Sequence, residues 1–99
     1  MILQILKVSE NSLYPDYRDG DFVFISKIPI FLRGVCVGDV VVFAHPTTGR
    51  LIKRVAQVLD GGKALWVLGL STDSVDSRSF GPVSIGQVMG KVIWHVSAR

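Results

Sequence analysis

The chain has 99 residues, of which 48% are hydrophobic and 19% are charged, and its formal net charge is +3. Compact domains usually contain about 100–150 residues, so this length predicts one domain that spans residues 1–99. The hydrophobic content excludes a disordered chain, and no run of basic residues interleaved with aromatics indicates a nucleic-acid partner. No stretch approaches the roughly 18 apolar residues of a membrane-spanning helix, so we expect no spanning segment.

Short runs rich in Val, Ile and Leu alternate with turn signals, which predicts a mainly β fold of antiparallel strands. The expected strands cover residues 2–8, 22–27, 40–44, 51–59, 64–68 and 87–96. The run 40–44 is apolar throughout and is expected to be buried on both faces. Residues 71–84 are polar and are interpreted as an irregular loop, of a length that is often functional. We predict no amphipathic helix.

An apolar segment follows the second expected strand. Ile28, Ile30, Phe31 and Leu32 are expected in a loop, where they offer a peripheral contact to a membrane surface or to a protein partner. Cys36 is the only cysteine, so it can form no internal disulfide, and we interpret it as a small buried hydrophobe. A cytoplasmic or peripherally membrane-associated protein is therefore expected.

Ser12 directly follows the first expected strand, which is a good position for an exposed hydroxyl group. Most serines in such positions only cap a turn, so a nucleophilic role requires an activating base. His45 and His95 lie in or at the end of apolar strands, without an acidic residue at triad spacing and without a metal-binding spacing. We interpret both histidines as structural, and we expect no metal and no cofactor.

Lys53 has the sequence environment of a lysine that acts as a base. A free lysine has a pKa of about 10.4, and burial among apolar groups disfavours its charged form. Strand alternation places Lys53 on the same face as Leu51 and Val55, and Arg54 on the other face. A snorkelling or salt-bridged strand lysine is the alternative interpretation.

The polar segment 71–78 offers groups that support such a base. A hydroxyl can hold a neutral amine in line with a nucleophile, and an Asp–Arg pair can fix the loop. An ordinary hydrogen-bonded turn is the alternative interpretation of the segment.

Five stretches of the chain resemble, in order, the sequence boxes of type I signal peptidases. They are Ser12-Leu13-Tyr14-Pro15, Gly20-Asp21, residues 38–43, Ile52-Lys53-Arg54-Val55 and residues 74–83. The first resembles the nucleophile motif Ser-Met-x-Pro, the fourth the general-base box, and the fifth the box Ser-x-Asp-Ser-Arg. The resemblance implies a signal-peptidase and LexA-like catalytic core. It also implies a serine endopeptidase that uses a Ser/Lys dyad to remove an N-terminal signal or propeptide from a precursor protein, cutting after small residues.

The resemblance also implies a role for individual residues. Ser12 would attack the scissile carbonyl, and its backbone N–H would contribute to the oxyanion hole. A neutral Lys53 would take the hydroxyl proton and later protonate the leaving amine. Ser74 would orient Lys53, while Asp76 and Arg78 would hold the loop in place.

Three departures from the family pattern bear on activity. Glu10 stands where the family usually has glycine or serine, and a carboxylate aimed at the developing oxyanion would raise the barrier. A chain inactivated in this way would be a peptide-binding or interaction module, which is the alternative function. Leu13 replaces Met with similar volume. Residues 69–71 read Gly-Leu-Ser in place of Gly-Asp-Asn, with one residue fewer before Ser74.

Eleven residues precede Ser12, which makes the sequence most similar to the short, anchor-free peptidases of nickel-type superoxide dismutase maturation. These peptidases trim the N-terminus of a precursor, so a precursor protein or peptide is the expected partner. A self-cleaving repressor-like domain ranks lower, because it would require a DNA-binding segment.

Overall fold

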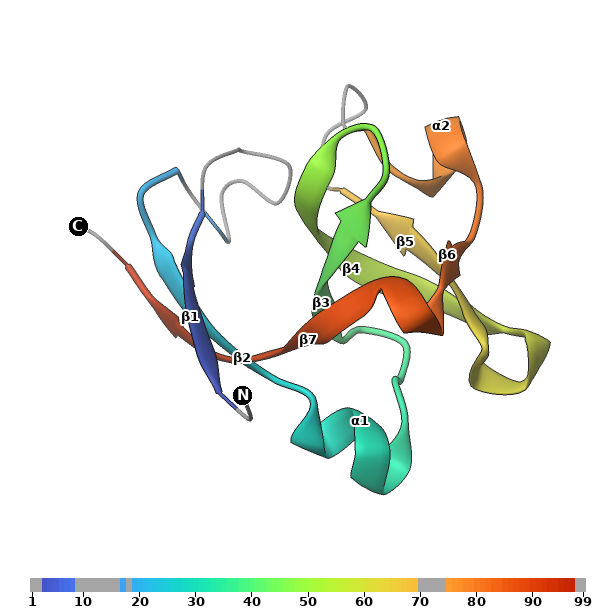
Figure 1. Cartoon of the computed structure of the whole chain (residues 1–99), viewed down its shortest axis with the longest axis horizontal. Coiled ribbons are helices and arrows are strands. Elements are labelled where there is room, and N and C mark those ends of the chain that lie inside the picture. The colour runs from blue at the N-terminus through green and yellow to red at the C-terminus, as the bar shows by residue number, and fades with distance from the viewer. Residues whose placement is uncertain (1–2, 9–16, 18, 70–74, 98–99) are drawn as a thin grey trace.

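The computed structural model describes residues 3–8, 17, 19–69 and 75–97 (Figure 1). The strands are β1 (Gln4–Lys7), β2 (Phe22–Ser26), β3 (Val40–His45), β4 (Gly49–Leu59), β5 (Ala64–Leu68), β6 (Val83–Ser84) and β7 (Val88–Val96). The helical elements are α1 (Ile28–Arg33), α2 (Ser77–Phe80) and the short 3-10 turns η1 (Asp60–Gly62) and η2 (Ile85–Gln87). The mainly β fold is confirmed, and each of the six expected strands is present within two residues of its expected bounds.

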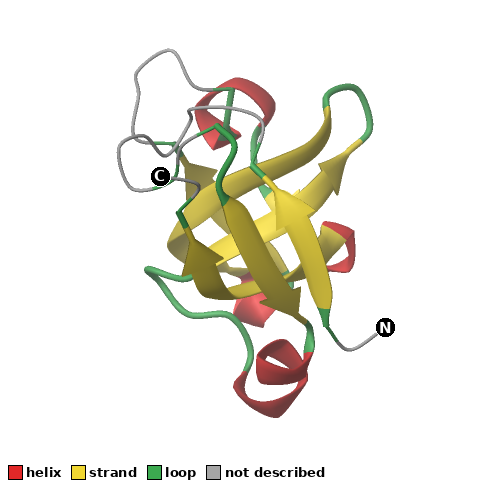
Figure 2. Cartoon of the chain, turned by 90° about the vertical axis from the view of Figure 1, so that its left-hand side faces the viewer, coloured by secondary structure: helices red, strands yellow, loops and turns green. Residues whose placement is uncertain are grey.

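The seven strands form one antiparallel sheet in the order β1-β2-β7-β3-β4-β5-β6. Strand β7 joins two parts of this sheet, because one half of it pairs with β2 and the other half with β3. The sheet curls strongly, so that β1 and β2 lie across from β3 and β4 (Figures 1 and 2). A Cβ atom at Gly90 of β7 would lie 3.1 Å from the Ser26 nitrogen and 3.2 Å from the Ile25 Cβ. A glycine at this position therefore permits the close approach of β7 to β2.

Because side chains alternate along β3 and β4, neighbouring residues of these strands pack into two separate cores. The first core contains Val41, Phe43, Leu51, Val55, Leu65, Val67, Val83 and Val88. The second core contains Val8, Val23, Ile25, Val40, Val42 and Ile52. Residues 40–43 of β3 are buried on both faces, as predicted, whereas Ala44, which was included in the prediction, is exposed. Consecutive residues of β4 therefore point into different cores, as Leu51 does into the first and Ile52 into the second.

Three expectations outside the strands are wrong. The apolar segment after β2 is the helix α1 and not a loop, and Pro29 lies in its first turn, where the fixed φ of proline favours a helix. Six residues are too few for a helical period to show in the sequence. The described part of segment 71–84 contains α2 and β6. Cys36 is exposed. In the part of the chain that the structure describes, no helix combines the length and the apolar character needed to cross a membrane.

Candidate active site

Lys53 lies on β4 opposite Val41 of β3. Its side chain is only 1% exposed and is among the largest fully buried side chains of the described residues. The strand neighbours Leu51 and Val55 belong to the first core, so the predicted face of Lys53 is confirmed. Burial penalises the charged form of an amine. A neutral lysine is the form that can accept a proton.

Ser12 lies outside the described residues, but the anchors on both sides of its segment are defined. The Val8 N–H donates to the Asp21 carbonyl at 2.7 Å, and the Gly20 N–H donates to the Val8 carbonyl at 2.7 Å. Val8 packs in the second core together with Ile52, the residue before the candidate base. The chain therefore enters the Ser12 segment beside the strand that carries the buried lysine.

The segment that contains Ser74 also starts beside this strand. Ser74 itself lies outside the described residues, as does Glu10. Leu68, at the end of β5, pairs with Arg54 of β4, the residue after the lysine. Both segments that carry expected site residues thus leave the sheet next to the centre of β4.

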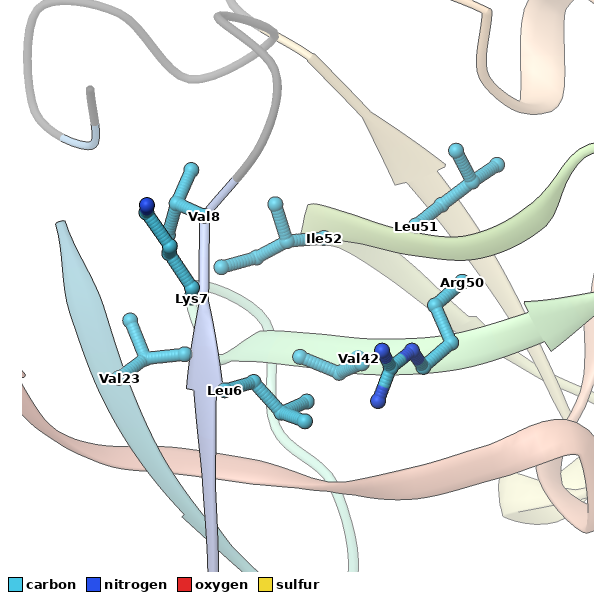
Figure 3. A pocket seen from close by; sticks show the side chains of 8 residues that line it. All are labelled: Leu6, Lys7, Val8, Val23, Val42, Arg50, Leu51 and Ile52. Atoms are coloured by element: carbon cyan, nitrogen blue, oxygen red, sulfur yellow. The ribbon is translucent and has the colours of Figure 1, made fainter. Parts of the chain in front are cut away.

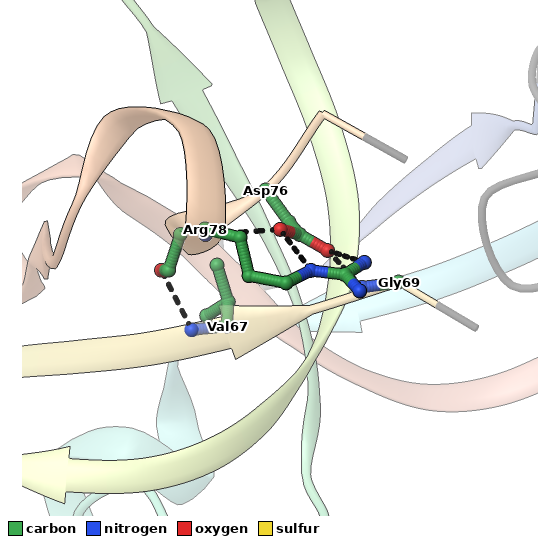
Figure 4. A network of polar contacts seen from close by, with 5 residues as sticks. Val67, Gly69, Asp76 and Arg78 are labelled. Carbon is green, nitrogen blue, oxygen red and sulfur yellow. Dashed lines mark hydrogen bonds and ion pairs between the residues drawn. The ribbon is translucent and has the colours of Figure 1, made fainter. Parts of the chain in front are cut away.

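Asp76 organises the chain where it returns from the Ser74 segment (Figure 4). Its side chain is fully buried, and its Oδ2 accepts a hydrogen bond from the Gly69 N–H at 2.8 Å. The Arg78 guanidinium donates from Nε to Oδ1 at 3.0 Å and from Nη2 to Oδ2 at 2.7 Å. The Arg78 backbone N–H donates to Oδ1 at 3.0 Å, which makes Asp76 the N-cap of α2. One carboxylate therefore ties the end of β5 to the start of α2.

The charge of Asp76 follows from these contacts. Burial raises the pKa of Asp76, but hydrogen bonds from the Arg78 side chain and from the Gly69 and Arg78 backbones outweigh it. The pKa of Asp76 therefore lies below its ordinary value. The bond to Asp76 also raises the pKa of Arg78. The two residues form the ion pair that the sequence pattern indicated.

Two other buried polar groups make contacts that the sequence did not predict. The Val67 N–H donates to the Ser77 Oγ at 2.8 Å, and Ser77 is 1% exposed. The sequence signal for Ser77 was its position between Asp76 and Arg78, the two residues of the ion pair. Asp21 is fully buried and lies 2.7 Å from His95 Nε2, and the Tyr17 ring stacks on the imidazole at a centroid distance of 4.4 Å. These groups make no metal site, because the described residues contain no group of three His, Cys, Asp or Glu side chains that could hold an ion.

A pocket of about 70 Å³ opens between β1 and the β3–β4 hairpin (Figure 3). Its walls are mostly apolar side chains from four strands. The lining residues are Leu6, Lys7, Val8, Val23, Val42, Arg50, Leu51 and Ile52. Two of them, Val8 and Ile52, lie next to the Ser12 segment and next to Lys53 in the chain. The pocket therefore lies at the end of β1 that leads to the Ser12 segment and beside Ile52, whose side chain points to the opposite face of β4 from that of Lys53.

Comparison with known proteins agrees with this arrangement. Residues 1–61 match the family described as signal peptidase, peptidase S26, and this range contains both Ser12 and Lys53. The chain is also similar to the mitochondrial inner membrane protease subunit 1 of Schizosaccharomyces pombe. The two are 30% identical over an alignment 116 positions long, gaps included, which covers 96% of this chain and 74% of that protein. The fold, the buried strand lysine and these matches define a peptidase-type domain. The chain belongs to the signal peptidase family, peptidase S26.

Proposed function

We propose that the protein is a serine endopeptidase that removes an N-terminal signal or propeptide from a precursor protein, cutting after small residues. Ser12 is the nucleophile and Lys53 the general base. The observation that carries the proposal is the burial of Lys53, at 1% exposure, in the first core of a signal peptidase family member. A lysine on a strand normally keeps its ammonium group in water. A buried amine fits the base role better than a solvated one.

The reaction uses the chain's own groups. The Ser12 Oγ attacks the carbonyl carbon of the scissile bond while neutral Lys53 accepts the hydroxyl proton. The Ser12 backbone N–H contributes to stabilising the oxyanion. Lys53 then gives its proton to the leaving amine, and water, activated by the same lysine, releases the acyl group. Ser74 orients the lysine, and the Asp76–Arg78 pair holds the adjoining chain.

An extended peptide fits beside β1. Within the described part of the chain β1 pairs only with β2, so its other edge presents backbone N–H and C=O groups. Addition of a strand to such an edge is a common mode of peptide recognition. A peptide along β1 would place one of its alternate side chains at the pocket (Figure 3) and continue toward the segment of Ser12.

Cleavage of precursor peptides with alanine at the cut site tests the dyad. Precursors of nickel-type superoxide dismutase belong in the panel because the sequence resembles their maturation peptidases. We expect cleavage to be lost in Ser12→Ala and in Lys53→Met, the latter keeping the side-chain volume. Lys63→Met, at an exposed turn, is the matched control. Cleavage that survives either dyad substitution overturns the assignment. An inert wild type with an active Glu10→Gly establishes the inactive binding module instead.

A peripheral membrane contact through α1 is part of the same proposal. Ile28, Phe31 and Leu32 are 42%, 81% and 80% exposed, whereas Ile30 packs against the first core and is not available. Figures 1 and 2 place α1 and α2 at opposite ends of the molecule. Co-sedimentation with phosphatidylserine-containing vesicles should fall in Phe31→Glu and Leu32→Glu. Binding that is absent in the wild type, or undiminished in the two variants, removes this part of the proposal.

A further inference from the structure

The pocket beside β1 has room for one side chain. Its volume of about 70 Å³ is roughly half of the 150 Å³ cavity that admits benzene. Leu6, Val8, Val42 and Ile52 give it an apolar floor and walls. An aliphatic stem can therefore be buried there, with its end at the mouth of the pocket.

Arg50 places a positive charge at that mouth. Arg50 pairs with Ala44, and strand alternation puts it on the same face of the hairpin as Ile52 and Val42. Figure 3 shows its guanidinium group extended over Val42 and toward Leu6. Among the eight lining residues the other cation is Lys7, whose side chain alternates to the opposite face of β1 from its neighbours Leu6 and Val8.

The donors of Arg50 are available to a ligand. Arg50 is exposed, and the ion pairs of the described residues join other groups. A guanidinium group presents a planar fork of N–H donors that matches a carboxylate with two parallel hydrogen bonds. An apolar pocket under such a fork complements a side chain with an apolar stem and an anionic end.

We propose that Arg50 selects an acidic residue, with glutamate preferred, at the position of the precursor peptide that occupies this pocket. This inference rests on the proposed function, because it assigns a substrate class to the same site. The methylene groups of glutamate contact the apolar walls, and its carboxylate pairs with Arg50 at the mouth. Aspartate keeps the charge but has a shorter stem, so it binds second best.

Peptide pairs that differ only by Glu or Gln test the selection. A neutral parent peptide with alanine at the cut site receives Glu or Gln singly at each of the five positions before the cut. We expect glutamate to raise kcat/KM about three- to tenfold over glutamine at one position, as for a charge pair in partial contact with water. The ratio of kcat/KM for the Glu peptide over the Gln peptide should fall to one in Arg50→Ala. Arg50→Glu should prefer a peptide with lysine at that position over the Glu peptide. High salt should reduce the wild-type ratio. Lys63→Ala, which removes an exposed cation at the β4–β5 turn, should keep it.

A binding measurement separates this inference from the proposed function. Fluorescence anisotropy of the same labelled peptides on Ser12→Ala requires no turnover and should give the same Glu-over-Gln ranking. Suppose that the wild type cleaves the parent peptide, but that the Glu-over-Gln ratio of kcat/KM is the same in the wild type and in Arg50→Ala. The selection by Arg50 is then refuted while the activity stands. If no peptide is cleaved, the proposed function fails. The binding ranking then decides for or against Arg50 on its own.

Discussion

Replacing Asp76 by asparagine removes the charge from a fully buried side chain and keeps its shape. In the wild type both carboxylate oxygens accept hydrogen bonds, Oδ1 from the Arg78 N–H and Nε, and Oδ2 from the Gly69 N–H and the Arg78 Nη2. An asparagine side chain has one oxygen only. Its amide nitrogen must therefore face two N–H donors, whichever way the amide is turned.

The loss in free energy of unfolding depends on which of the hydrogen bonds to Asp76 can be replaced by hydrogen bonds to water. A hydrogen bond to a charged group contributes about 1.5–3 kcal/mol. The Arg78 side chain is 45% exposed, so water compensates for much of its loss. The bond between the Gly69 N–H and the buried carboxylate has less access to water. We therefore expect the free energy of unfolding to fall by about 2–3 kcal/mol, which corresponds to roughly 10–20 °C in Tm for a chain of this length.

The lowered pKa of Asp76 determines how the stability difference between the wild type and Asp76→Asn changes with pH. The pKa of Asp76 is lowered in the folded protein from an ordinary value of 3.8. A lowered pKa means that the ionised carboxylate stabilises the fold above the unfolded pKa, and that this contribution is lost as the pH falls through the folded pKa. The asparagine side chain of the variant does not titrate. The difference between wild type and Asp76→Asn should therefore be constant from neutral pH to about pH 5 and should shrink below about pH 4.

Urea unfolding followed by tryptophan fluorescence at pH 7, 5 and 3 measures this difference. Asp60→Asn is the matched control, because Asp60 is exposed and has a positive φ of 52°, which asparagine tolerates. A loss below about 0.5 kcal/mol at pH 7, the range of ordinary surface substitutions, would refute the structural role of the carboxylate. A difference that stays unchanged down to pH 3 would refute the electrostatic reasoning.

Three further substitutions probe the fold and the site. Lys53→Met should abolish peptide cleavage while a cooperative urea unfolding transition remains, since an apolar group of similar volume fills the buried position. Ser77→Ala should lower the free energy of unfolding by about 1–2 kcal/mol in the same assay, because a buried backbone N–H loses its acceptor. Gly90→Ala should lower Tm by several degrees in calorimetry, since a methyl group would lie 3.1 Å from the Ser26 nitrogen and cost about 1 kcal/mol or more. An unchanged Tm in Gly90→Ala would show that β7 can shift away from β2.

The strands and the face of Lys53 were predictable because both follow from local rules. Alternating or continuous apolar runs bounded by glycine, proline and aspartate define strands, and alternation alone sets which neighbours share a face. Other features depend on distant parts of the chain. Asp21 and His95 are 74 residues apart, and only the pairing of β2 with β7 brings them together. The helix α1 has six residues, which is less than two turns, so no period could reveal it.

The turn between β3 and β4 connects the two strands whose register decides on which face Lys53 lies. His45 Nδ1 accepts hydrogen bonds from the backbone N–H groups of Thr47 and Thr48, at 3.2 and 3.3 Å, and His45 pairs with Gly49. This turn sets how many residues separate the two strands. A shift of β4 by one residue against β3 would move every β4 side chain to the other face. The side chain of Lys53 would then exchange the first core for the second, and that of Ile52 would take its place. The register between these two strands is thus as important for the position of the candidate base as the lysine itself.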